Sequence, residues 1–314
     1  MQETRARHNK WISYKIPPEW DGKKVEEVLK GPLALSNRMI NRLTRCRGIQ
    51  LNGRMPWLGR RVNAGDHLRV AVRPLERSDL APEPVPFGLL YEDADLMVVD
   101  KPAGVNVHPV HPKETGTLTH GILFHWQRQG FEGRVRPVHR LDRDTTGVLL
   151  IAKNAYMHQL LDRQLKSRSI ERVYLAIVKG RLVQESGTIR LPIDRDPTHP
   201  LRRRVAEGGA DAITLFRVLA ATEQASLIKA KLETGRTHQI RVHFSHLGHP
   251  LWGDRLYGGP SGRIERHALH AERLSFTHPL KQEAMTFSAP PPPDFARLME
   301  ELGLQRNRPP ASPA

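Results

Sequence analysis

The sequence predicts an α+β protein made of two unequal domains. Short apolar runs typical of strands and amphipathic runs typical of helices are mixed along the chain without strict alternation, which favours α+β over a doubly wound sheet. The chain has 314 residues, 39% hydrophobic and 26% charged, an ordinary composition for a folded protein. Four prolines fall between residues 74 and 86, and because proline stiffens the chain we expect a linker at 75–87.

The N-terminal part of the chain is strongly basic. Residues 1–75 hold sixteen Lys or Arg against six Asp or Glu, which is +10 of the net charge of +16. Eight basic residues and no acidic one lie between Glu27 and Asp66. Clustered cations gain affinity for phosphates by releasing counterions, so a polyanionic partner is expected, with a merely solvated basic surface as the alternative. We find no signal peptide and no apolar run near the ~18 residues that a membrane span needs.

A basic helix is predicted first. Ser36 is expected to cap a helix over residues 37–47, and Gly48 to end it. Two stripes at helical spacing run along it. The apolar stripe consists of Met39, Ile40, Leu43 and Cys46, and the basic stripe of Arg38, Arg42 and Arg45. The basic stripe would be free to face phosphates.

Two short strands are predicted after the helix. Residues 49–51 form the first, Asn52-Gly53 is typical of a tight turn, and residues 68–72 alternate as the second. The run "LSNRMINRLTRCRGIQLNGRMPWLGRRVNAGDHLRVAV" resembles the small α/β RNA-binding domain first described in a ribosomal small-subunit protein, the S-four-like domain. The resemblance covers residues 12–74. It implies that the RNA-binding residues are Arg38, Arg42, Arg45, Arg47 and Arg54.

The rest of the chain carries four segments in which Arg, His, Asp or Thr stand beside Gly or Pro at the ends of apolar strands. They are "DKPAGVNVHP" (100–109), "RPVHRLDRDTTGVLLIAK" (136–153), "LETGRTHQIRVHFSHLGHPLWGDRLYG" (232–258) and "RHALHAERLSFTHP" (266–279). Functional sites are usually built from polar groups on turns at strand ends. Residues 237–248 also read as an amphipathic helix that ends at Gly248.

Together these segments resemble the large bacterial family of pseudouridine synthases that act on ribosomal or transfer RNA. The family hallmark, HRLD-x-x-T-S-G, reads here from His139 to Gly147, with Thr146 where serine is commoner. The resemblance spans about residues 85–297. It implies a mixed, largely antiparallel sheet with a catalytic cleft in a domain at 88–300. The composition of the last residues, which cannot bury an apolar face, predicts a disordered tail at 301–314.

The resemblance also implies the chemistry. The bond from uracil nitrogen to ribose is broken, the base is turned, and it is rejoined through carbon, without cofactor or metal. The essential aspartate maps to Asp142, and Arg236 matches the arginine that pairs with it. Arg140 matches the family arginine that helps to hold the RNA and occupies the place of the extruded base. Tyr174 matches the family tyrosine that lies beside the uracil. A nearby cation keeps the carboxylate ionised, because the cation lowers the pKa of the carboxylate.

Alternatives remain open from the sequence. A non-catalytic RNA-binding or ribosome-assembly factor with the same fold is one, although the set of Asp142, Arg236 and Tyr174 favours the enzyme. The sixteen histidines show no His-Glu-x-x-His spacing, so no metal site is predicted. The single cysteine, Cys46, fits a reducing cytoplasm. We expect a cytoplasmic, monomeric enzyme that acts on ribosomal rather than transfer RNA.

Overall fold

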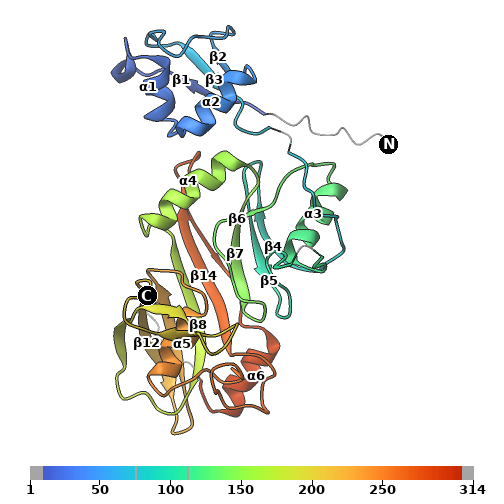
Figure 1. The fold of residues 1–314 in the computed structure, drawn as a ribbon, viewed down its shortest axis with the longest axis vertical. Helices are drawn as coiled ribbons and strands as arrows, with labels where there is room; N and C mark the ends of the chain where they lie inside the picture. Colours follow the sequence, from blue (N-terminus) through green and yellow to red (C-terminus); the bar gives the residue numbers. More distant parts are fainter. Residues whose placement is uncertain (1–9, 75, 112, 306–314) are drawn as a thin grey trace, which may run out of the picture.

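The computed structural model describes residues 10–74, 76–111 and 113–305. The small N-terminal domain lies at one end of an elongated molecule, and the larger domain occupies the rest (Figure 1). Most of the tail expected at 301–314 lies outside the described residues. For residues 301–305, which the structure describes, the expectation of disorder was wrong. Leu302 and Leu304 are buried against Phe295, because the last helix returns its apolar face to the sheet.

The small domain packs two helices against a three-stranded antiparallel sheet of order β1-β3-β2. Its elements are β1 (Ile12–Lys15), the 3-10 turn η1 (Pro18–Trp20), α1 (Val25–Lys30), α2 (Asn37–Arg45), β2 (Ile49–Leu51) and β3 (His67–Val70). Ser36 caps α2 by accepting the Met39 N–H at 3.3 Å, as predicted. The helix ends two residues earlier than expected, since Arg47 adopts a left-handed conformation with φ of 53°.

The turn after β2 is the predicted Asn-Gly turn. Asn52 and Gly53 both have positive φ, 50° and 79°, as a tight hairpin turn of the primed type requires. Leu51 and Arg54 pair across it. The Asn52 side chain then bonds Asp66 and the His67 N–H, which ties the turn to the start of β3.

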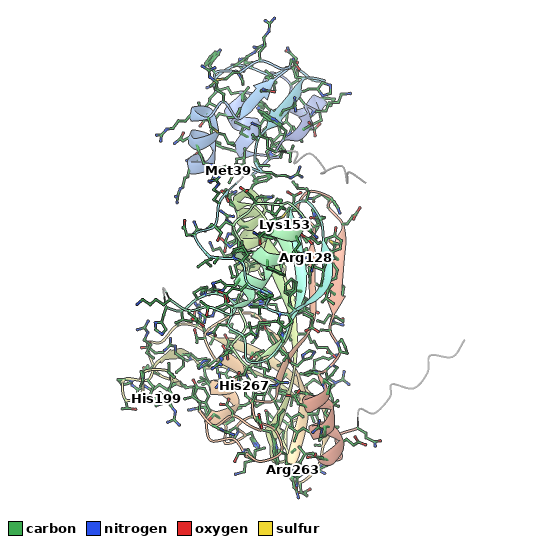
Figure 2. All side chains as sticks on the ribbon, turned by 90° about the vertical axis from the view of Figure 1, so that its right-hand side faces the viewer. Met39, Arg128, Lys153, His199, Arg263 and His267 are labelled. Carbon is green, nitrogen blue, oxygen red and sulfur yellow. The ribbon has the colours of Figure 1, made fainter. Side chains whose placement is uncertain are left out.

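The large domain is built on a ten-stranded mixed sheet with the path β4-β5-β7-β14-β8-β13-β12-β9, to which β15 adds beside β14 and β6 beside β7. The strands are β4 (Gly88–Glu92), β5 (Leu96–Lys101), β6 (Arg136–Pro137), β7 (Thr146–Ala152), β8 (Glu171–Lys179), β9 (Ser186–Arg190), β12 (Ile213–Ala221), β13 (Ala225–Leu232), β14 (Leu269–Thr277) and β15 (Ala284–Ser288). A separate hairpin pairs β10 (Ile193–Arg195) with β11 (Arg203–Val205). It projects from one side, where Figure 2 labels His199.

Four helices accompany the sheet: α3 (Leu118–Arg128), α4 (Ala155–Lys166), α5 (Gln239–His246) and α6 (Pro293–Glu301). None of the helices in the described ranges is long and apolar enough to cross a membrane. The predicted α+β class is confirmed, and so is the largely antiparallel sheet, since β7 with β14 is the parallel pair among the described strands.

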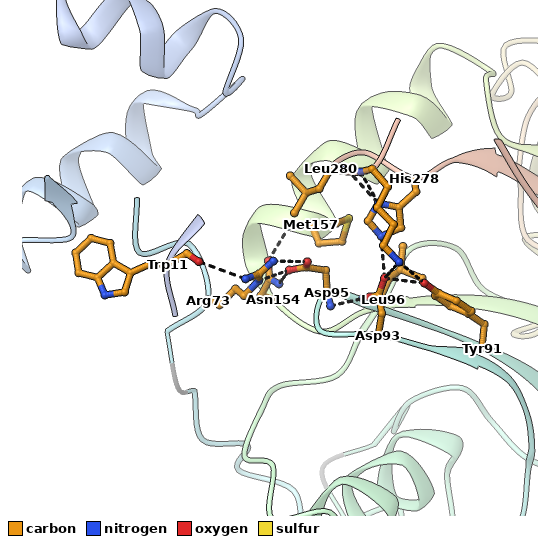
Figure 3. Close-up of polar contacts among 11 residues, drawn as sticks. Trp11, Arg73, Tyr91, Asp93, Asp95, Leu96, Asn154, Met157, His278 and Leu280 are labelled. Atoms are coloured by element: carbon orange, nitrogen blue, oxygen red, sulfur yellow. Dashed lines mark hydrogen bonds and ion pairs between the residues drawn. The ribbon is translucent and has the colours of Figure 1, made fainter. Parts of the chain in front are cut away.

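The two domains are joined by specific contacts besides the linker (Figure 3). Arg73 forms a two-pronged ion pair with Asp95, both bonds 2.6 Å long. The Tyr156 hydroxyl, from α4, donates to the Leu33 carbonyl at 2.6 Å, and Gln159 donates to the Ala34 carbonyl at 2.7 Å. Tyr156 is itself buried in the hydrophobic core of the small domain. The small domain is therefore docked on α4, with Met39 near the boundary (Figure 2).

Candidate active site

The loop that carries Asp142 is fixed where β7 begins beside β14. Gly147 has φ of 110°, and a Cβ there would lie 2.2 Å from the Ala271 carbonyl oxygen, so only glycine permits this close approach. The hydroxyls of Thr145 and Thr146 bond the rings of His267 and His270 at 2.7 and 2.9 Å. Thr146 thus supplies the hydroxyl that serine would.

A buried lysine holds the loop that carries Asp142 through hydrogen bonds to backbone carbonyls. The Lys101 ammonium donates to the carbonyls of Pro102, Val105 and Arg143, each at 2.8 Å, and the residue is fully buried. Burial lowers the pKa of Lys101 to about 7. Three carbonyl acceptors require three N–H donors, however, and this favours the ammonium form. Lys101 therefore joins the β5 turn to the residue that follows Asp142.

The cation that pairs with Asp142 is Arg241, from the first turn of α5. Its Nη1 donates to Asp142 Oδ2 at 3.0 Å. Its Nε and Nη2 donate to the two carboxylate oxygens of Asp254 at 2.7 and 2.9 Å. The guanidinium also lies 5.1 Å from the centre of the Tyr257 ring. Asp254 holds the Nε and Nη2 atoms, and Tyr257 lies against one face of the guanidinium. The orientation of the guanidinium is therefore fixed, and its Nη1 atom points to Asp142.

These charges keep Asp142 ionised. Burial favours the neutral acid, but His238, whose Nε2 lies 3.9 Å away, and Arg241 outweigh that effect and hold the pKa of Asp142 below its ordinary value. Burial also lowers the pKa of His238 itself, so Arg241 supplies the charge that is always present. The Asp142 side chain keeps 18% of its surface exposed and can still be reached from outside.

A small pocket opens above this carboxylate. Its lining includes Asp142, Tyr174, Arg140 and Arg236, so the structure brings together all four predicted site residues. Tyr174 is buried on β8, and burial followed by the charge of Asp142 raises the pKa of its phenol. Arg140 and Arg236 are exposed at the rim. The pocket therefore combines one ionised acid, one neutral phenol and two cations.

Comparison with known proteins gives this site a family. A family model described as RNA pseudouridylate synthase matches residues 95–246. Another, described as the RluD ribosomal pseudouridine synthase N-terminal domain, matches residues 12–68. YhcT from Bacillus subtilis, named an uncharacterized RNA pseudouridine synthase, is 42% identical over 285 residues, 90% of this chain and 94% of its own. The chain belongs to the RNA pseudouridine synthase family.

Other proteins of this family are similar to the chain in sequence or in structure. The ribosomal large subunit pseudouridine synthase D of Xanthomonas campestris pv. campestris is 41% identical over 255 residues, which is 77% of each chain. The solved structure of human RNA Pseudouridylate Synthase Domain Containing 1 matches with a TM-score of 0.56 at 26% identity, over 72% of this chain and 98% of its own. As an RNA pseudouridine synthase, the protein is an enzyme that isomerises uridine in RNA.

One expectation about the synthase site was wrong. Arg236 does not pair with Asp142; its Nε donates to the Asp211 carbonyl at 2.9 Å. The reason is local: His238 adopts a left-handed conformation, φ 59°, just before α5 begins. The loop before this turn directs Arg236 outward, whereas Arg241 lies inside the helix and faces Asp142.

Three further groups of the synthase site were not singled out from the sequence: Arg241, Asp254 and Tyr257. All three lie within the segment 232–258, so the signal was present. A buried helix that contains an arginine needs an acidic partner, and the Gly-Asp within "WGDRLYG" offers one.

Two buried histidines near the site bond other groups of the protein. His243 bonds the Thr214 hydroxyl and the Leu191 carbonyl, and His270 bonds Thr146 and the Ala289 carbonyl. Among the described residues, no group of three or more His, Cys, Asp or Glu is placed to hold a metal ion.

The arginines proposed to bind RNA remain on the surface of the small domain. Arg38, Arg45, Arg47 and Arg54 are exposed. Arg42 is exposed too, but its Nη1 lies 3.5 Å from Glu76, which also pairs with Arg136 of the large domain. One member of the basic stripe is therefore already engaged at the domain boundary.

Proposed function

We propose that the protein converts specific uridines of large-subunit ribosomal RNA to pseudouridine in the cytoplasm, as a monomer, with Asp142 as the essential carboxylate. The observation that carries this proposal is the ion pair between Asp142 and Arg241 in a pocket lined by Tyr174. The ribosomal target rests on relatives named ribosomal large subunit pseudouridine synthase D.

The pocket residues suit a flipped uridine. A base inside folded RNA must leave its stack to reach Asp142, at a cost of a few kcal/mol. Arg140 and Arg236 at the rim are placed to hold the flanking phosphates, and contacts with phosphates offset this cost. The neutral Tyr174 phenol offers a ring for stacking and an O–H for hydrogen bonding next to the base. Its raised pKa disfavours a role as phenolate base in the free enzyme.

The carboxylate acts at the ribose in this scheme. Arg241 holds Asp142 ionised and aimed into the pocket, so an anion is ready beside the sugar carbon from which uracil departs. Asp254 and Tyr257 are positioning residues, because they hold Arg241 and do not themselves line the pocket. Tyr257 also bonds the ring of His238, which does line it, at 2.8 Å. In the isomerisation the bond from N1 to the ribose carbon breaks and a bond from C5 to that carbon forms. The C5 proton leaves to solvent and N1 takes up a proton, so no atom is gained or lost overall. The pocket residues stabilise the charge that develops and hold the detached base while it turns.

The test is a comparison of the wild type with Asp142→Asn. The substitution is nearly isosteric, so the fold should persist while tritium release from RNA labelled at the fifth carbon of uracil is lost. Carbodiimide mapping of ribosomal RNA from cells with and without the protein should reveal sites that disappear with it. An Asn variant that releases tritium at the wild-type rate contradicts the role of Asp142. Unchanged ribosomal maps, with new unmodified sites in transfer RNA, contradict the choice of substrate.

A further inference from the structure

The loop between β2 and β3 carries an unusually exposed aromatic side chain. Trp57 is 72% exposed, whereas Trp126 and Trp252 are buried and Trp11 and Trp20 are partly buried. An exposed tryptophan leaves a large apolar surface in water, which a folded domain normally avoids unless the side chain meets a partner. Trp57 does not belong to the hydrophobic core of the small domain, so packing in that core does not account for a tryptophan at this position.

The Trp57 ring is held in place although it is exposed. A Cβ at position 59 would lie 2.0 Å from the Trp57 ring atom Cζ3, so the indole rests directly against the backbone of Gly59. The Arg60 N–H donates to the Trp57 carbonyl at 3.0 Å and closes a turn, and the preceding Pro56 is buried. One side of the ring is thus supported, while most of the side chain faces solvent. A ring fixed before binding loses little conformational entropy when a partner stacks on it.

The surroundings of the ring are basic. Arg54, Arg60 and Arg61 of the same loop are all exposed. The Val25 N–H bonds the Arg60 carbonyl and the Val62 N–H bonds the Lys23 carbonyl, so the exposed Lys23 and Lys24 run beside the loop.

The carboxylates of this part of the domain are engaged by other groups. Asp21 accepts the Ala64 N–H and Asp66 accepts the Asn63 N–H, each at 2.8 Å. Glu26 pairs with Lys30 at 2.5 Å, and Glu27 accepts the Lys24 backbone N–H at 2.7 Å. Five cations therefore lie on this loop or beside it, while the carboxylates of the same region are engaged by other groups.

We propose that Trp57 is a stacking platform for an unpaired nucleobase of the RNA substrate, with the neighbouring phosphates held by Arg54, Arg60 and Arg61. An aromatic face between cations matches the alternation of base and phosphate in a single strand. A protein partner would need a wider apolar patch than Trp57 and the half-exposed Met55 provide. The inference rests on the proposed function as an RNA-modifying enzyme and on the expectation from the sequence that the small domain binds RNA. It adds the residues that form the binding site and the part of the RNA that is recognised.

The probe is an RNA hairpin with a single-stranded tail of about eight nucleotides, within the span that one small domain covers, compared with the same hairpin without the tail. Trp57→Ala in the full chain should weaken binding of the tailed RNA about tenfold, or about 1.4 kcal/mol, and binding of the blunt hairpin much less. Trp57→Phe should retain most of the affinity. Tailed RNA should quench tryptophan emission in the wild type and much less in Trp57→Phe.

Controls separate this inference from the proposed function. Val183→Ala changes a 95% exposed side chain on the large domain and should not alter affinity for either RNA. A Trp57→Ala variant that binds tailed RNA like the wild type, or that loses equal affinity for both RNAs, overturns the stacking proposal. If Arg38→Ala with Arg45→Ala weakens binding while the Trp57 variants do not, only the stacking site fails. If all these variants bind like the wild type, the small domain does not grip RNA at all.

Discussion

Two groups of arginines show opposite uses of the same side chain. In the catalytic pocket, Arg241 is buried and every arm of its guanidinium is engaged, by Asp142 on one side and Asp254 on the other. On α2, Arg38 and Arg45 are exposed, and among the described residues neither forms an ion pair. The buried arginine is fixed by its partners before substrate arrives, whereas the surface arginines keep their charge available for a partner.

This difference separates orientation from attraction. A buried cation costs several kcal/mol of desolvation, which is offset only when good hydrogen bonds hold it in one geometry. That cost is justified where a carboxylate must be aimed within tenths of an ångström. Surface cations attract phosphates without such precision, and each contributes through released counterions. Substitutions in the two groups should therefore change different quantities.

The largest effect is expected at Arg241. Arg241→Gln should reduce the rate at saturating RNA by about 10²-fold or more, since one fixed charge beside the reacting carboxylate is lost. Burial then acts on Asp142 without opposition from this arginine and raises its pKa, so the acid limb of the pH–rate profile should move to higher pH. Single-turnover rates across pH measure both changes.

Arg241→Lys and Arg236→Gln serve as comparisons for this variant. The lysine keeps the charge and should restore the position of the acid limb in part. Arg236 does not contact Asp142, so Arg236→Gln should leave the limb where it is. If Arg236→Gln moves the acid limb and Arg241→Gln does not, the assignment of the charge partner is reversed.

A smaller loss of rate is expected at Asp254. Asp254→Asn removes the carboxylate that holds two arms of Arg241 but leaves the contact with Asp142 possible, so the rate should fall about tenfold. The half-saturating RNA concentration should change little, because Asp254 does not line the pocket. An effect on that concentration alone would show that Asp254 serves binding instead of orientation. Circular dichroism and thermal melting check that the fold is intact.

The surface arginines should alter salt dependence rather than rate. Arg38→Ala with Arg45→Ala should flatten the plot of log affinity against log salt by about one and a half to two units. Arg42→Ala should add less than a full unit, because Glu76 already engages that side chain. Arg181→Ala, a surface arginine on the large domain paired with Glu223, is the matched control. Filter binding at several salt concentrations measures the slope of log affinity against log salt for each variant. Equal slopes for all variants and the wild type would indicate that the basic face is only solvated and does not contact RNA.

The smallest effect is expected at the domain boundary. Tyr156→Phe removes the bond to the Leu33 carbonyl and leaves a buried acceptor without its donor, which should cost about 1 kcal/mol of the free energy of unfolding. Denaturant titration measures it. The rate at saturating RNA should stay at the wild-type level, because Tyr156 does not line the pocket. A large fall in rate would show that the placement of the small domain controls the chemistry itself.

The sequence was a good guide wherever a signal is local. The capped helix α2, the Asn52-Gly53 turn and the buried strands β5 and β7 follow from propensity and periodicity. The ordered motifs placed Asp142 and Tyr174 in one pocket. The choice between Arg236 and Arg241 could not be made this way, because both lie in one motif and only the left-handed turn at His238 decides which side chain points inward. The docking of Arg73 on Asp95 and of Tyr156 on Leu33 joins residues far apart in the chain, and no local pattern encodes it.

The docked small domain has a thermodynamic consequence. An RNA-binding domain on a flexible linker would lose its freedom of movement each time RNA contacted both domains. This loss of entropy would make the free energy of binding less favourable and lower the affinity. Here the ion pair of Arg73 with Asp95 and the hydrogen bonds from α4 immobilise the domain when the chain folds. The second contact with the same RNA then forms at a high effective concentration, set by the fold and not by the length of the linker.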